Sequence, residues 1–169
     1  MGFDFEARIG NIVNALKDYN SATSSPDLSG GLTARVIDDN ILPVRSEKIR
    51  AAWRGDRFPA LFVRVPNAEE EFMTIGGMSG VQNARKQMTV TYDIVGFLGL
   101  EGAHKSFENL DSEMRILAKN ISSIFYKENT GSGTALWVAP VNYQFDFEDV
   151  EGSLVGAVLV QLEGKYFFT

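Results

Sequence analysis

The sequence predicts an α+β fold, with a mostly antiparallel sheet, two main helices packed on one face and a long C-terminal β-hairpin. Residues 86–98 alternate between an apolar and a more polar face, as a half-buried strand does. Residues 4–19 and 106–126 each carry one apolar stripe at helical spacing. Residues 136–147 and 154–168 alternate again around a short acidic turn, which indicates an antiparallel hairpin.

Composition favours one domain spanning residues 1–169. The chain is 44% hydrophobic and 22% charged, which are ordinary globular values. It has no cysteine, so disulfides and thiolate chemistry are excluded, and its net charge of −6 argues against nucleic-acid binding as the main activity. The N-terminus lacks a signal-peptide pattern, and the longest apolar run, residues 154–160, is too short to span a bilayer. We therefore expect a soluble, unprocessed protein.

The first third of the chain begins with a helix over residues 4–19, with Asp4 as its N-cap. Residues 20–31 are rich in turn formers and have almost nothing to bury, so we expect a surface loop, or a segment that orders on a partner. A short strand is expected at 32–37. A short helix is expected at 46–54, with Trp53 at or near the core.

The middle of the chain is expected to hold the centre of the sheet. Residues 58–65 form a strand that Pro66 ends, and residues 67–85 form a polar, glycine-rich arm with a short strand at 72–75. The strand at 86–98 would be roughly 40 Å long. It must therefore bend, with a bulge at Gly96, or project beyond the sheet.

The last third pairs a helix with the hairpin. Leu110, Met114, Leu117 and Ile121 lie on one face of the predicted helix at 106–126. In the strand at 136–147 the alternation shifts phase beside Pro140, which predicts a β-bulge or an edge position. Residues 148–152 are expected to form a turn.

No pattern of catalytic or ligand-binding residues emerges. The glycines at 76–80 lack the Lys-Ser/Thr of a phosphate loop, and His104 is the only histidine, so no histidine-based metal cluster exists. Acidic residues group at 38–39, 69–71, 146–149 and 151, all in expected turns and without calcium-loop spacing. The bases between Arg45 and Arg57 suggest a solvated face or a contact with an acidic partner. We therefore expect no catalytic residue, no metal and no cofactor.

The layout resembles the tail terminator, or tail completion, proteins of tailed bacteriophages. The resemblance rests on an amphipathic first helix, the strand Phe-Pro-Ala-Leu-Phe-Val-Arg-Val at 58–65 and the strand Met-Thr-Val-Thr-Tyr-Asp-Ile-Val-Gly-Phe at 88–97. The helix at 106–126 and the closing strands ending Gly-Lys-Tyr-Phe-Phe-Thr complete it. It covers nearly the whole chain and is a resemblance of layout and length.

The resemblance implies a virion protein of the tail or neck, assembled in the host cytoplasm. It implies a homo-oligomeric ring, expected to be a hexamer, that caps the tail tube and joins the tail to the head connector. Expected partners are the tail tube protein, the sheath where one exists, and head–tail connector or neck proteins. DNA would pass through the channel without specific binding, and no membrane is involved.

Two groups of residues follow as candidates from this ring hypothesis. Interface residues are expected in the arm and are Phe72, Met73, Ile75, Met78 and Arg85. Channel-facing acids are expected in the turns and are Glu69, Glu70, Glu71, Glu148, Asp149 and Glu151. The bases at 45–57 would face outward or meet an acidic neighbour.

Three alternatives stay open. The chain could be another tail or neck subunit, such as a tube protein whose rings stack indefinitely. It could be a small metal-dependent hydrolase that uses the acidic turns, which added divalent metals would stabilise. It could also be a ligand-binding domain, which requires an enclosed apolar pocket.

Overall fold

The computed structural model describes residues 2–44, 58–72, 86–99, 107–129, 135–150 and 153–168. Its helices are α1 (Phe5–Asp18), the short 3-10 helix η1 (Asp38–Asn40) and α3 (Phe107–Lys127). Its strands are β1 (Ile41–Pro43), β2 (Ala60–Phe72), β3 (Lys86–Gly99), β4 (Trp137–Val150) and β5 (Ser153–Phe168). The predicted α+β fold is confirmed.

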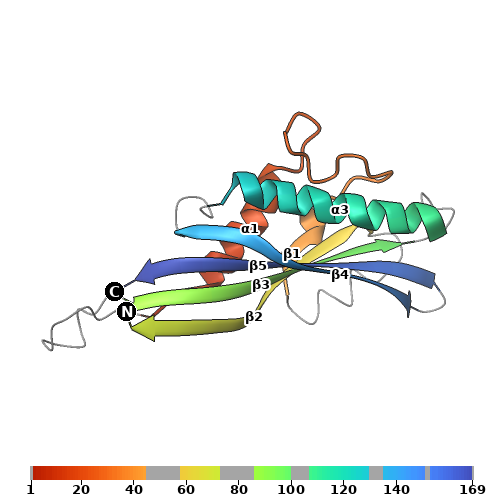
Figure 1. Ribbon diagram of the computed structural model, residues 1–169. Coiled ribbons are helices and arrows are strands. Elements are labelled where there is room, and N and C mark those ends of the chain that lie inside the picture. Colours follow the sequence, from red (N-terminus) through yellow and green to blue (C-terminus); the bar gives the residue numbers. More distant parts are fainter. Residues whose placement is uncertain are drawn as a thin grey trace, which may run out of the picture.

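One five-stranded sheet holds the strands in the order β1-β2-β3-β5-β4. Only the pairing of β1 with β2 is parallel, and β4 and β5 form the predicted C-terminal hairpin. Both α1 and α3 lie on the same face of this sheet (Figure 1). We call this the helix face and the opposite one the open face.

The main core lies between the helix face and the two helices. The predicted stripe of α3, Leu110, Met114, Leu117 and Ile121, is fully buried there. Alternate residues of β3 from Met88 to Leu98 face it, as the alternation predicted. Asp4 caps α1 as expected, because its carboxylate accepts a hydrogen bond of 3.0 Å from the Ala7 N–H.

The long strand β3 lies inside the sheet, between β2 and β5. Its register with β5 runs without a break from Lys86 to Gly99, so the bulge proposed at Gly96 is wrong. The strand does not need to bend or project, because its neighbours are as long. β2 has 13 residues and β5 has 16. Gly96 instead makes room for Leu117 of α3.

Two expected breaks behave differently in the structure. Pro66 does not end β2, because a register shift between Arg64 and Asn67 absorbs it and the strand continues to Phe72. The predicted irregularity at Pro140 is confirmed, since the register of β4 shifts between Pro140 and Asn142 and β4 is an edge strand.

The segment between α1 and β1 also departs from expectation. It is not a loop with nothing to bury, because Leu28 is fully buried. The Asn120 side chain of α3 donates to the carbonyls of Leu28 and Gly30 at 3.0 and 2.8 Å. Residues 32–37 form no strand, whereas the three-residue strand β1 was not predicted. The expected helix at 46–54, with Trp53, lies outside the described residues.

Candidate subunit interface

The outer side of β4 exposes apolar side chains in the middle of the strand. Val141, Tyr143 and Phe145 leave 52%, 40% and 46% of their surfaces exposed. Tyr143 and Phe145 pair with Val160 and Val158 of the core, which places both aromatic rings on the helix face. Because β4 is the last strand of the sheet, no described strand covers this side.

Tyr143 is tied to α3 by hydrogen bonds. Its hydroxyl lies 2.8 Å from that of Ser122, which lies 2.9 Å from the Ala118 carbonyl oxygen. A further hydrogen bond with Tyr143 raises the pKa of Tyr126, whose exposed ring stands on the same side of α3. Tyr143 is therefore held in place, whereas no such bond restrains the Phe145 ring.

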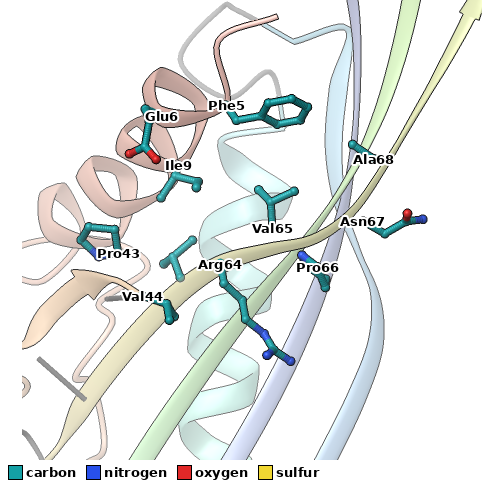
Figure 2. Close-up of a pocket in the computed structure, with 11 residues that line it drawn as sticks. Phe5, Glu6, Ile9, Pro43, Val44, Arg64, Val65, Pro66, Asn67 and Ala68 are labelled. Carbon is teal, nitrogen blue, oxygen red and sulfur yellow. The ribbon is translucent and has the colours of Figure 1, made fainter. Parts of the chain in front are cut away.

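A second surface lies at the opposite edge of the sheet, where β1 ends and β2 continues alone. A pocket of about 590 Å³ opens there between the start of α1 and the middle of β2. Figure 2 shows Phe5, Ile9 and Val65 turned toward this space and Arg64 turned away from α1. Its walls are mostly apolar, with Glu6 and Asn67 at the rim.

The start of α1, which forms one wall of this pocket, is held by aromatic contacts. The Phe3 ring lies 5.2 Å from the Tyr166 ring and 5.5 Å from the Phe168 ring, measured between centroids. The Arg8 guanidinium carbon lies 5.1 Å from the centroid of Tyr166. Tyr166 is itself hydrogen-bonded to Tyr92 across β3 and β5, and burial raises the pKa of both hydroxyls.

The open face carries a polar row across the sheet. Asp93 of β3 is only 2% exposed, although it lies on the face without helices. Arg64 Nε donates to one of its oxygens at 2.9 Å, and Gln161 Nε2 donates to the other at 2.9 Å. Both oxygens of Asp93 are thus engaged, and the row joins β2, β3 and β5 without offering a free base.

Five of the six predicted channel acids lie in strands, so their expected placement in turns is wrong. Glu69 and Glu71 pair with Thr89 and Gln87 on the open face, whereas Glu70 lies on the helix face, with a carboxylate oxygen 2.9 Å from Lys86 Nζ. In β4, Glu148 lies on the open face and Asp149 on the helix face. All five are exposed except where Glu70 meets Lys86. Glu151 lies outside the described residues.

The predicted interface residues are mostly undescribed. Phe72 is the last residue of β2 and pairs with Lys86. Met73, Ile75, Met78 and Arg85 lie outside the described residues, as do His104 and the basic segment 45–57. The arm is shorter than predicted, because residues 67–72 belong to β2.

The exposed apolar residues of β4 were missed by the sequence reasoning. The alternation gave Tyr143 and Phe145 one face of the strand but did not show that this face is exposed at the edge of the sheet. The phase shift beside Pro140 was the available signal, because it marks an edge strand.

The described residues supply no evidence for a metal centre or a membrane span. Among them no three His, Cys, Asp or Glu side chains are grouped so that they could hold a metal ion. Neither described α-helix is both long and apolar enough to cross a membrane.

Comparison with known proteins adds no family assignment. No protein-family model matches the chain, and no curated protein matches its sequence.

Proposed function

We propose that this protein is a structural subunit of a bacteriophage tail, a tail terminator whose copies close into a ring that caps the tail tube. The observation that carries the proposal is the exposed apolar stretch on β4, because soluble proteins usually guard a long edge strand from pairing with other chains. On β4 the charged residues Asp146, Glu148 and Asp149 all come after Phe145 in the strand. The exposed stretch from Val141 to Phe145 therefore contains no charge that would guard it.

The arrangement of the edges supports a ring rather than a symmetric pair. The exposed edge of β4 and the pocket beside β2 lie at opposite edges of the sheet and are unlike each other. Contacts between unlike surfaces repeat from copy to copy and close into a ring when the rotation permits. The resemblance of the layout to tail terminators, an argument from fold alone, adds the place of the ring on the tail.

In this proposal the ring is a homo-hexamer located in the tail or neck of the virion. It binds the end of the tail tube, and the sheath where one is present, on one side and the head–tail connector on the other. DNA passes through its channel, and the acids of the open face keep phosphate groups from binding to the wall. No bound cofactor is required for this role.

Electron microscopy of the purified protein tests the proposal, alone and mixed with the tail tube protein. We expect closed rings of one size alone, and tubes that stop growing when the rings are added. Open tubes of indefinite length from this protein alone would contradict a terminator and favour a tube subunit. A large rise in melting temperature with Mg²⁺ or Mn²⁺, without rings, would favour a metal-dependent hydrolase.

A further inference from the structure

Two stretches of strand backbone lack a described partner. We name residues 141–146 of β4 the β4 edge and residues 64–71 of β2 the β2 edge. Directly after the β4 edge, the Phe147 N–H donates to Asp146 Oδ1 at 2.8 Å. Beside the first part of β4, the Val138 N–H donates to the Asn129 carbonyl at 2.5 Å, so the β4 edge begins after this bond. β1 pairs with β2 only as far as Val63, so the β2 edge begins where β1 ends.

The strand registers show which backbone groups point outward. The Val44 N–H donates to the Val63 carbonyl at 2.9 Å, so Val63 directs its backbone groups away from β3. Ile94, Val90 and Met88 of β3 are separated by even numbers of residues, so their backbone groups point to the same side of β3. Their partners beyond the register shift, Ala68 and Glu70, therefore also direct their backbone groups away from β3.

The same alternation extends across the sheet to β4. Val63 pairs with Ile94, Ile94 with Val160, and Val160 with Tyr143. Because Val63 points its backbone groups away from β3, Ile94 and Val160 bond to each other. Tyr143 and Phe145 therefore direct their N–H groups away from β5.

The side chains beside the two edges are complementary. Phe145 projects from the β4 edge on the helix face, and the apolar pocket lies on the helix face of the β2 edge, beneath Phe5 and Ile9. If the sheet of one copy continued into the next, both sets of helices would stay on one side. The Phe145 ring of one copy would then lie between its own α3 and the α1 of the neighbour.

The charges on the open face are complementary as well. Asp146 stands exposed on the open face of the β4 edge, and Glu148 stands on the same face just after it. Arg64 stands on the same face at the start of the β2 edge, with 55% of its side chain exposed while it holds Asp93. Glu69 and Glu71 stand on this face at the other end of the β2 edge, which an antiparallel pairing sets beside the uncharged start of the β4 edge. A β4 edge paired with a second β4 edge would bring no base to these acids and would leave the pocket empty, which disfavours a symmetric dimer.

We propose that the β4 edge of one copy pairs antiparallel with the β2 edge of a second copy, with Phe145 seated in the pocket under α1. The sheets of successive copies then form one continuous sheet around the assembly. This inference rests on the proposed function, because it supplies the contact that closes the ring.

A proline substitution tests the backbone contact on the β2 edge. Glu70→Pro removes an outward N–H, which an edge strand tolerates in the isolated chain. Glu70→Ala is the matched control, because it loses the same contact with Lys86 and keeps the N–H. By sedimentation velocity we expect Glu70→Pro to weaken self-association about 10- to 100-fold relative to Glu70→Ala. Circular dichroism and melting curves confirm that each variant is folded.

A charge introduced on the β4 edge tests the other half of the contact independently of the proline substitution. Phe145→Lys places a charge where the pocket is apolar, and Phe145→Leu is its control. We expect Phe145→Lys to be a monomer and Phe145→Leu to assemble.

Mixing the two defective variants distinguishes unlike from like edges. Glu70→Pro keeps an intact β4 edge and Phe145→Lys keeps an intact β2 edge, so together they form a single sound contact. At a concentration at which the wild type assembles and Glu70→Pro by itself does not, we expect each variant to be monomeric alone and the mixture to stop at a heterodimer. A symmetric pairing of β4 edges would leave Glu70→Pro dimeric by itself, and this result would overturn the inference.

The remaining outcomes separate this inference from the proposed function. If Glu70→Pro and Phe145→Lys both assemble like the wild type, the edges are not the contact, although the protein can still cap tubes. If the edges pair as described but the rings fail to stop tube growth, the tail-terminator role is wrong and the contact stands. A wild-type protein that stays monomeric at all concentrations would overturn the inference.

Discussion

Leu117 of α3 lies directly over Gly96 of β3, where a Cβ added to the glycine would stand 2.7 Å from Leu117 Cδ2. Leu117 is fully buried among the core residues of both helices and the sheet. We therefore expect Leu117→Ala to lower the free energy of unfolding by about 2–5 kcal/mol, because it leaves a cavity at the centre of the core. Urea denaturation measures this, and an unchanged midpoint would contradict the packing.

Gly96→Ala tests the same contact from the strand side. The added methyl group must displace Leu117 from a packed position, so we expect a loss of about 1–3 kcal/mol. In the Leu117→Ala background the methyl group has room, and Gly96→Ala should cost much less. A double-mutant cycle measures this coupling, and additive costs would show that the two residues do not compete for one space.

The ends of α1 and α3 are joined by a bond that should be sensitive to alkaline pH. The Tyr19 hydroxyl, just after α1, donates to Glu128 Oε1 at 2.6 Å, and this bond raises the pKa of Tyr19 from 10.0 to about 12. A pKa raised by folding means that the folded state favours the neutral hydroxyl. Its contribution to stability is therefore complete below pH 10 and is lost as the pH rises toward 12.

Tyr19→Phe isolates this contribution. Below pH 10 the variant should be less stable than the wild type, because Glu128 loses its donor. Between pH 10 and 12 the difference should shrink, since the wild type then loses the same bond. Thermal unfolding at several pH values measures the difference, and one that stays constant across this window would show that the bond does not set the pKa.

The polar row on the open face predicts an unequal response to losing either partner. Arg64→Met leaves the Asp93 carboxylate buried with Gln161 as its described donor, so we expect a loss of about 1–3 kcal/mol. Asp93→Leu removes the buried charge, and the half-exposed Arg64 returns to water, so its cost should be smaller.

The double variant Arg64→Met with Asp93→Leu serves as the check on this row. It should recover part of the stability that Arg64→Met loses, because no buried charge is left without its partner. The measurement is urea denaturation below the concentration at which the protein assembles. Equal costs for both single variants would contradict the inequality.

The sequence was sufficient to predict the helices and the long strands, because their signals are repeated along many residues. Leu110, Met114, Leu117 and Ile121 repeat at helical spacing, and Met88 to Ile94 alternate without a break. Local signals were less reliable. Pro66 indicated the end of a strand, but a bulge is an equally acceptable place for a residue without an N–H. A single leucine, Leu28, did not indicate that its loop is anchored in the core.

The candidate interface could not be predicted, because it depends on the order of the strands. Phe145 and Val158 both lie in stretches of sequence that alternate between apolar and other residues. Only Phe145 is exposed, because β4 is at the edge of the sheet and β5 is not. The pocket beside β2 likewise depends on β1 ending early and on α1 lying above it. These are relations between elements distant in sequence, which periodicity does not contain.

The acids of the open face give a last prediction, which rests on the proposed ring. If the open face lines the channel, reversing its charge should make the assembled particle bind DNA, because lysines there would displace counterions from the phosphates.

Glu69→Lys with Glu71→Lys reverses the charge of the open face. Asp18→Lys with Glu108→Lys changes the net charge equally on the helices, away from both edges, and is the control. Particles of the first variant should retard DNA in electrophoresis with an affinity that falls steeply with salt, whereas wild-type particles should not. If the control retards DNA as strongly or more strongly, the open face does not line the channel.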